Sequence, residues 1–221
     1  IVCTILRISR MLVLCRESPS RVCAIITFQI LAGDAPKVQH PVAVFVAQRF
    51  IVPDTPRAVD ADAAEWVRTA QGIQTVGVFR NAELHTVLRI RQQLDLDWVQ
   101  LHGDEPDSMV EAAARRVIRR VPVRSVVAWT RIEALARICL PLFDPGGGDG
   151  VPWSWEALAD APAGLRFGVA GGLDPEVVGG VVRAVRPALV DVSSGVEAAP
   201  GIKDHELVRQ FVAEARRAQA D

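Results

Sequence analysis

From residue 73 onward, short apolar runs alternate with longer segments in which apolar residues recur every three or four positions. The apolar runs are typical of buried strands and cover residues 73–79, 96–101, 125–129, 139–143, 166–170 and 188–192. The segments with helical periodicity between them cover residues 82–94, 106–120, 131–138, 153–160, 174–187 and 204–218. This alternation predicts βα units built around a parallel sheet.

The first part of the chain supplies the remaining units. Residues 41–46 form another apolar run, residues 59–71 have helical periodicity, and we expect one further strand within the first thirty residues. Eight βα units in 221 residues predict an α/β protein, a single-domain (β/α)8 TIM barrel over residues 1–221. A doubly wound open sheet is the competing architecture, and the lack of a Gly-rich dinucleotide motif after the early strands weakens it.

Composition excludes several classes of function. Half of the residues are hydrophobic and the formal charge is −1, which fits one domain with a sizeable core and argues against a nucleic-acid-binding protein. No apolar stretch approaches the length of a membrane span, and residues 11–15 are too short for a signal-peptide core. The four cysteines form no C-x-x-C pair. We therefore expect a cytoplasmic protein with no membrane or nucleic-acid partner.

Two strand ends of the predicted barrel carry small residues suited to binding a phosphate. Gly171 and Gly172 end one strand, and Ser193, Ser194 and Gly195 end the last. Glycines let the backbone approach an anion, and the loops after strands seven and eight of such barrels commonly bind phosphate. The alternative is a pair of ordinary βα turns, but the two motifs occur together at the two expected strands.

Other strand ends carry candidate catalytic side chains. Asp144 follows an apolar strand and precedes a Gly-rich loop, so it is either a general acid at the barrel mouth or a loop carboxylate. Gln100 and His102 lie two positions apart and share one face of their strand. His102 is either a substrate contact or a structural histidine, and no second ligand at metal spacing accompanies it. Asp204 is expected to cap the last helix.

Several motifs in this order resemble the phosphoribosylanthranilate isomerase family of tryptophan biosynthesis. The segments are DTPRAVDADAAEWV, TVGVFRN, DWVQLHGDE, FDPGGGDGVPWSW, GVAGGLDPEVV and VDVSSGVEAAPGIKDHE, and the resemblance covers roughly residues 54–218. It implies a (β/α)8 barrel without a cofactor or metal that acts on a small phosphoribosyl substrate as a monomer or homodimer. The implied reaction converts N-(5-phosphoribosyl)anthranilate into 1-(2-carboxyphenylamino)-1-deoxyribulose 5-phosphate by an acid/base Amadori rearrangement.

The resemblance also implies roles for individual residues. Asp144 matches the general acid of the family, and Arg57 matches the arginine that binds the anthranilate carboxylate. The phosphate-binding residues match Gly171, Gly172, Ser193, Ser194 and Gly195. Gln100, His102 and Asp191 are expected to contact the substrate.

The general base is where this sequence departs from the family. The family carries a strand-one cysteine in a K-I-C-G-[LI]-T motif, which is not present here, and residues 1–53 are atypical. Cys15 is the favoured candidate, Cys23 is the second, and the third possibility is that no base exists. Real divergence, an altered reading frame or a different start would each produce this pattern.

Three hypotheses about function follow. The first is an active isomerase, and the second is a barrel that binds a phosphorylated ligand without catalysis because strand one lacks its base. The third is another sugar-phosphate barrel enzyme, such as the related histidine-pathway isomerases, which use two aspartates. The lack of an aspartate at the end of the first strand disfavours it.

Overall fold

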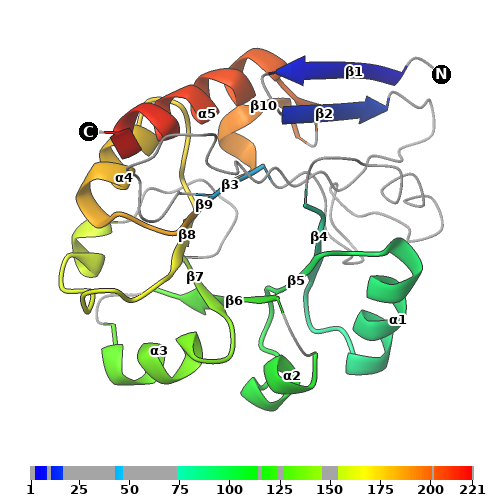
Figure 1. Cartoon of the computed structure of the whole chain (residues 1–221), viewed down its shortest axis with the longest axis vertical. Helices are drawn as coiled ribbons and strands as arrows, with labels where there is room; N and C mark the ends of the chain where they lie inside the picture. Colours follow the sequence, from blue (N-terminus) through cyan, green and yellow to red (C-terminus); the bar gives the residue numbers. More distant parts are fainter. Residues whose placement is uncertain are drawn as a thin grey trace.

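The computed structural model of the chain describes residues 74–113, 116–123, 127–145, 154–200 and 202–220, and the backbone of residues 3–8, 11–16 and 43–46. Seven of the described strands form one parallel sheet. In sheet order these are β3 (Ala43–Val46), β9 (Leu189–Val192), β8 (Gly168–Ala170), β7 (Leu140–Asp144), β6 (Val117–Pro122), β5 (Trp98–Leu101) and β4 (Val76–Phe79). The sheet curls around a centre, and helices lie outside it (Figure 1).

The described helices follow the strands in the order expected for βα units. They are α1 (Leu84–Leu94), α2 (Asp107–Ala112), α3 (Trp129–Ala136), α4 (Val178–Val185) and α5 (His205–Ala220), with the short 3-10 helices η2 (Trp155–Leu158) and η3 (Ser194–Val196). Asp204 Oδ1 accepts hydrogen bonds from the backbone N–H groups of Glu206 and Leu207, which confirms the predicted cap of α5. This is the architecture of a (β/α)8 barrel.

Two apolar layers separate the inside of the sheet from its outside. The inner layer contains strand residues that the alternation directs to a common centre, among them Val76, Ile118, Leu142, Ala170 and Leu189. The outer layer packs the alternate strand residues against the helices. Its largest fully buried side chains are Phe79, Phe143 and Phe211. The next inward position along each strand therefore lies at the barrel mouth.

The structure corrects the predicted boundaries around residues 106–129. The helix predicted over residues 106–120 ends at Ala112, and β6 occupies Val117–Pro122. Arg116 adopts a left-handed backbone conformation with φ of 63°, which reverses the chain before the strand. The strand predicted over residues 125–129 is also wrong, because the described end of that segment leads into α3 at Trp129.

The first strands are also arranged differently from the prediction. β1 (Cys3–Ile8) and β2 (Met11–Arg16) pair with each other in an antiparallel sheet of their own, whereas β3 pairs directly with β9. A strand from the first thirty residues had been expected in the barrel. A second small sheet joins β10 (Glu197–Ala199) to β11 (Ile202–Lys203). The helix predicted over residues 59–71 lies outside the described residues, and the single-domain organisation stays a prediction.

Candidate active site

Polar side chains converge at the carboxyl ends of the parallel strands. Because β5, β7 and β9 run in the same direction, the inward residues Gln100, Asp144 and Asp191 all lie toward one end of the barrel. Each of the three is buried, with 2%, 9% and 7% of its surface exposed. Gln100 and Asp191 are in hydrogen-bond contact although three strands separate β5 from β9, so the sheet is curled tightly enough to bring its opposite walls together.

Asp144 is the last residue of β7 and lies against two neighbours on the inner wall. Its Oδ2 atom is 3.5 Å from Nε2 of His102. A Cβ atom added to Gly171 would lie 3.3 Å from Oδ1 of Asp144 and closer still to Pro145, so only glycine fits there without displacement. The predicted acid therefore lies between His102, which follows β5, and the first glycine of the expected phosphate site.

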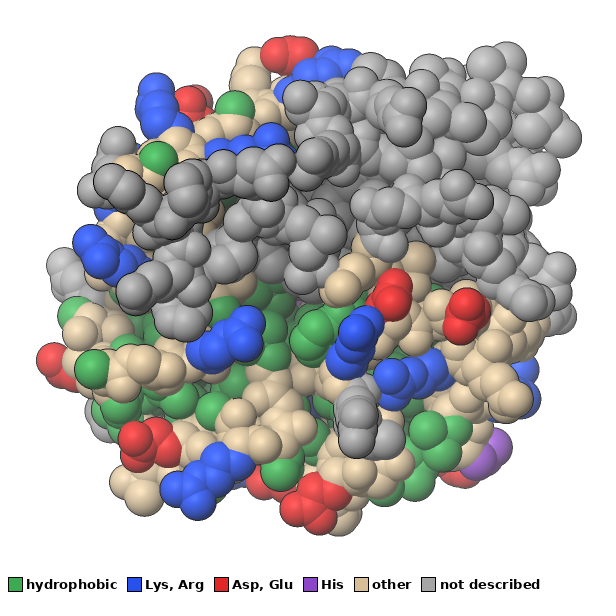
Figure 2. All heavy atoms as spheres, viewed as in Figure 1, with side chains coloured by type: hydrophobic (Ala, Val, Ile, Leu, Met, Phe, Trp, Pro, Cys, Tyr) green, Lys and Arg blue, Asp and Glu red, His purple; other side chains and the backbone are tan. Residues whose placement is uncertain are grey.

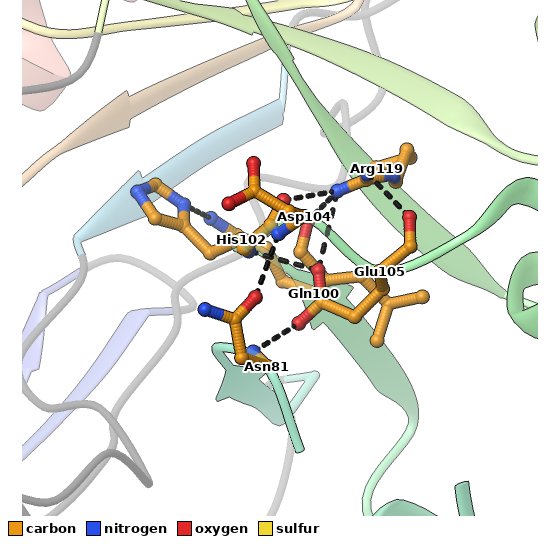
Figure 3. A network of polar contacts seen from close by, with 8 residues as sticks. Asn81, Gln100, His102, Asp104, Glu105 and Arg119 are labelled. Carbon is orange, nitrogen blue, oxygen red and sulfur yellow. Dashed lines mark hydrogen bonds and ion pairs between the residues drawn. The ribbon is translucent and has the colours of Figure 1, made fainter. Parts of the chain in front are cut away.

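Gln100 connects the two aspartates through His102. Its Nε2 atom lies 3.4 Å from Oδ2 of Asp191 and 3.3 Å from Nδ1 of His102. The contact between Gln100 and His102 is visible in Figure 3. Together with the contact between His102 and Asp144, these residues form a buried polar chain that crosses the barrel mouth.

Burial changes the ionisation of two members of this chain. The pKa of His102 falls to about 4, mainly because burial disfavours the imidazolium, while Asp144 opposes the shift and Arg120 adds to it. Burial, together with a smaller contribution from the nearby charge of Asp144, raises the pKa of Asp191 to about 7. At neutral pH, His102 is therefore an uncharged hydrogen-bonding group and Asp191 is close to half-protonated.

A second network fixes the loop after β5. Glu105 accepts hydrogen bonds from the backbone N–H groups of Asn81 and Gly103, at 2.7 and 2.8 Å. Arg119 donates to the carbonyl oxygens of Gly103 and Glu105 and contacts the Glu105 carboxylate at 3.3 Å. The backbone N–H of Asp104 donates to Asn81 Oδ1 (Figure 3). We call Asn81, Gly103, Asp104, Glu105 and Arg119 the loop clip; it holds the segment that carries His102.

The two predicted phosphate-binding loops pack against each other. Gly171 and Gly172 have φ angles of 83° and 66°, which non-glycine residues adopt at a cost. Gly195 in η3 lies so close to the Leu173 carbonyl that a Cβ atom would overlap it. Among the described residues, the buried Oγ atom of Ser193 has no hydrogen-bond partner, whereas Ser194 is exposed. This arrangement places closely packed backbone and the Ser193 hydroxyl at the corner where an anion is expected.

The structure also identifies two residues near the site that sequence reasoning missed. Lys203 is buried and its Nζ atom donates to the Ser193 carbonyl and to Glu197, both at 2.7 Å. Arg120 is two positions after inward-facing Ile118, so it lies on the inner face of β6, and its buried Nε atom has no partner within the described part of the chain. The pair of arginines in VIRRV could have indicated this, because a strand places one of them inward.

The remaining predicted site residues are not placed by the structure. Cys15 lies in β2, opposite Thr4 of β1, and its side chain is outside the described residues. Arg57 and Cys23 also lie outside them. Cys139 precedes β7, and burial raises its pKa to about 12, which makes its thiol unsuitable as a base. The assignments of Cys15 and Arg57 stay predictions.

The described surface, residue clusters and helices add three observations. On the face shown in Figure 2, the described basic and acidic side chains are interspersed. Within the described ranges, no three His, Cys, Asp or Glu side chains are grouped in a way that could hold a metal ion. None of the described helices combines the length and apolar character needed to cross a membrane.

The curled parallel sheet and the carboxylates at its strand ends define a (β/α)8-barrel enzyme, and comparisons with known proteins specify which one. The family model described as N-(5'phosphoribosyl)anthranilate (PRA) isomerase matches residues 32–214. The chain belongs to this family. A relative of that name from Geobacter sp. (strain M21) is 40% identical over 170 residues, covering 74% of this chain and 83% of the relative. The Myxococcus xanthus relative is 42% identical over 174 residues, covering 74% and 82%.

Solved structures agree with this assignment. The crystal structure of phosphoribosyl anthranilate isomerase from Thermotoga maritima aligns with a TM-score of 0.68 and 32% identity, covering 76% of this chain and 86% of that one. Another isomerase structure, with a TM-score of 0.67 and 30% identity, contains reduced 1-(o-carboxyphenylamino)-1-deoxyribulose 5-phosphate and covers 76% and 86%. These likenesses confirm the predicted (β/α)8 fold and the predicted family.

Proposed function

We propose that this chain converts N-(5'-phosphoribosyl)anthranilate into 1-(2-carboxyphenylamino)-1-deoxyribulose 5-phosphate in tryptophan biosynthesis. The observation that carries the proposal is the position of Asp144. It is a buried carboxylate at the barrel mouth, next to His102 and against the first glycine of the expected phosphate corner. An acid in this place can reach the ring oxygen of a ribose whose 5-phosphate lies at the neighbouring loops.

The reaction requires only proton transfers. Asp144 donates a proton to the ribose ring oxygen, the bond from that oxygen to C1 breaks, and the anthranilate nitrogen supplies the electron pair that forms a Schiff base. A base then removes the proton from C2, and the electron pair released by that C–H bond gives the enolamine. Protonation at C1, with loss of the proton from the C2 hydroxyl, yields the ketone. Because the substrate is neither oxidised nor reduced overall, the proposed reaction needs no redox cofactor.

The other residues bind and orient the substrate in this proposal. Gly171, Gly172, Ser193, Ser194 and Gly195 hold the phosphate, and Arg57 holds the anthranilate carboxylate. Asp191 is buried, and among the described residues its Oδ1 atom has no hydrogen-bond partner, which suits a carboxylate that bonds to a polar group of the substrate. His102 is neutral and serves as a hydrogen-bond donor or acceptor, since its pKa of about 4 leaves no imidazolium at neutral pH.

A second candidate function is supported by the position of the cysteines. The family match begins at residue 32, so Cys15 and Cys23 both precede it, and β2 pairs with β1 outside the seven-stranded sheet. A barrel without a competent base would still bind the phosphorylated substrate through residues 32–214. It would then be a ligand-binding protein that does not catalyse the rearrangement.

Two measurements on the purified chain separate these functions. Turnover of N-(5'-phosphoribosyl)anthranilate, followed by chromatography of the product, tests catalysis. Binding of the reduced product analogue, followed by calorimetry, tests the site. Turnover together with rescue of a tryptophan auxotroph that lacks this isomerase supports the enzyme, whereas binding without turnover or rescue supports the second candidate. If the chain shows neither binding nor turnover, both candidate functions are refuted. The cytoplasmic location and the monomeric or homodimeric state stay predictions.

A further inference from the structure

We propose that Gln100 is a positioning residue that sets the tautomer of His102, and that this tautomer places the acidic proton of Asp144 on its Oδ1 atom. The catalytic consequence rests on the proposed isomerase function. The arrangement of hydrogens itself does not, because it follows from the contacts of the described side chains.

The first step concerns the orientation of the Gln100 amide. Its Nε2 atom lies 3.4 Å from Oδ2 of Asp191 and 3.3 Å from Nδ1 of His102, and an NH2 group has two hydrogens to donate. The reversed amide would require protons on both Asp191 Oδ2 and His102 Nδ1. The orientation in the structure requires no proton on either atom. Since Gln100 is only 2% exposed, water does not compete for these contacts.

The second step fixes the hydrogen on His102. A neutral imidazole has one N–H group, and its position is set by the hydrogen bond that the other nitrogen makes. Nδ1 accepts from Gln100, so the hydrogen is on Nε2. Nε2 is the atom that lies 3.5 Å from Oδ2 of Asp144. His102 therefore directs its N–H toward Oδ2 of the proposed general acid.

The third step identifies the oxygen of Asp144 that carries the proton for the substrate. Oδ2 faces the N–H of His102 and acts as an acceptor, so a proton there would oppose the imidazole hydrogen. Oδ1 remains as the protonated oxygen. It is the oxygen that lies against Gly171, at the corner where the phosphate is expected. The chain from Asp191 through Gln100 and His102 thus aims the acid toward the ribose.

The test compares three variants. Gln100→Glu replaces the donating amide by an accepting carboxylate, and Gln100→Leu removes both donors while keeping a similar volume. Gln92→Glu is the matched control, since Gln92 is an exposed residue of α1 and the same charge change occurs there away from the site. Imidazole ¹⁵N NMR at neutral pH reports the tautomer, and the His102 signal is assigned among the four histidines with a His102→Asn variant.

We expect the Nε2–H tautomer of His102 in the wild type and in Gln92→Glu. In Gln100→Glu, His102 should change to the Nδ1–H tautomer or to imidazolium, and in Gln100→Leu the Nδ1 signal should move to that of a nitrogen without a hydrogen bond. Turnover should fall roughly 3- to 10-fold in both Gln100 variants, the effect of one lost hydrogen bond between neutral groups, with KM little changed.

Three results would overturn the proposal: an Nδ1–H tautomer in the wild type, an unchanged His102 spectrum in either folded Gln100 variant, or a loss confined to KM. If Gln100→Glu does not fold, the Leu variant decides. Failure of the proposed function would look different, because an inactive wild type with the expected tautomer leaves the hydrogen arrangement standing. In that case the proposed role in catalysis is refuted, since there is no acid step to position.

Discussion

At the residue scale, Asp191 and His102 make opposite contributions to stability as pH changes. The pKa of Asp191 is raised from 3.8 to about 7, so the folded protein retains a proton that the unfolded chain has lost. The contribution of Asp191 to the free energy of unfolding is therefore fully present below pH 4 and is lost as pH rises to 7. The pKa of His102 is lowered from 6.5 to about 4, so its contribution is present above pH 6.5 and is lost as pH falls toward 4. In the wild type, these two changes of stability with pH therefore have opposite signs and partly cancel.

Single substitutions should reveal the pH dependence of stability that each group contributes. Relative to the wild type, Asp191→Asn should gain stability as pH rises from 4 to 7, by on the order of 4 kcal/mol, because one pKa unit corresponds to about 1.4 kcal/mol. His102→Asn should change in the opposite direction and gain stability as pH falls. Urea unfolding across this range measures both. If the free energy of unfolding changed with pH in the same way for both variants, burial would not shift the pKa values of Asp191 and His102 as described.

Asp144 provides a second prediction at the residue scale. Asp144→Asn should lower kcat by about 10²- to 10⁴-fold, the usual effect of removing a positioned acid, while KM and thermal stability change little. Asp160→Asn is the control, because Asp160 is an exposed residue after η2. Steady-state kinetics and a thermal melt are sufficient. A fully active Asn variant would exclude Asp144 as the proton donor.

At the scale of elements, the loop clip joins the loops after β4 and β5 to Arg119 within β6. The side chain of Glu105 is 1% exposed and that of Arg119 is 12% exposed, so their charges are compensated mainly by each other and by backbone groups. Removing one partner of a buried pair leaves an uncompensated charge, which is strongly destabilising. The clip therefore stabilises the turn that carries His102 as well as the fold.

Glu105→Gln should lower the free energy of unfolding by about 3 kcal/mol, since Arg119 loses its carboxylate partner. The matched control is Glu214→Gln in α5, whose partner Arg217 is 69% exposed. Exposed pairs contribute little, so we expect a change within about 0.5 kcal/mol. Urea unfolding measures both values. Equal losses in the two variants would mean that the clip is no stronger than a surface ion pair.

The contact between the loops after β8 and β9 yields a prediction about binding. Gly195→Ala places a methyl group against the Leu173 carbonyl, so the two loops must separate and the phosphate corner widens. KM should rise and the affinity for inorganic phosphate should fall, both by a larger factor than the decrease in kcat. Gly180→Ala in α4 is the control, because a Cβ atom there meets nothing within 4 Å and alanine favours the helix. Phosphate inhibition that is unchanged in Gly195→Ala would argue against this corner as the phosphate site.

The sequence predicted well those elements in which hydrophobic residues recur with one clear helical or strand period. α1 was expected over residues 82–94 and occupies Leu84–Leu94, and β7 and β9 were predicted within two residues of their ends. β6 was missed because residues 106–120 contain good helix formers, and the turn depends on the left-handed conformation of Arg116. That error also concealed Arg120, since an arginine placed on a helix is not expected to face the barrel interior. Lys203 was missed because its partner Glu197 belongs to a neighbouring short strand.

At the scale of the whole molecule, parallel topology explains why much of the candidate site could be predicted. The polar residues that follow each apolar run must meet at one end of the barrel, and Gln100, Asp144 and Asp191 do so. The first 53 residues lack this regular pattern. β1 and β2 form an antiparallel pair, which satisfies their backbone hydrogen bonds locally and makes no use of the parallel register with β9 that a barrel strand requires.

This difference between the two parts of the chain bears directly on the missing base. If the isomerase is active, one thiol near the start of the chain removes the C2 proton, and Cys15 is the favoured candidate. Cys15→Ala should then lower turnover by about 10²- to 10⁴-fold, whereas Cys23→Ala and Cys139→Ala should not. Cys139 is the internal control, because its pKa of about 12 leaves it protonated. Single-turnover kinetics and deuterium exchange at C2 locate the affected step. Equal turnover in the wild type and Cys15→Ala would exclude Cys15, and loss of C2 exchange in Cys23→Ala alone would transfer the role to Cys23.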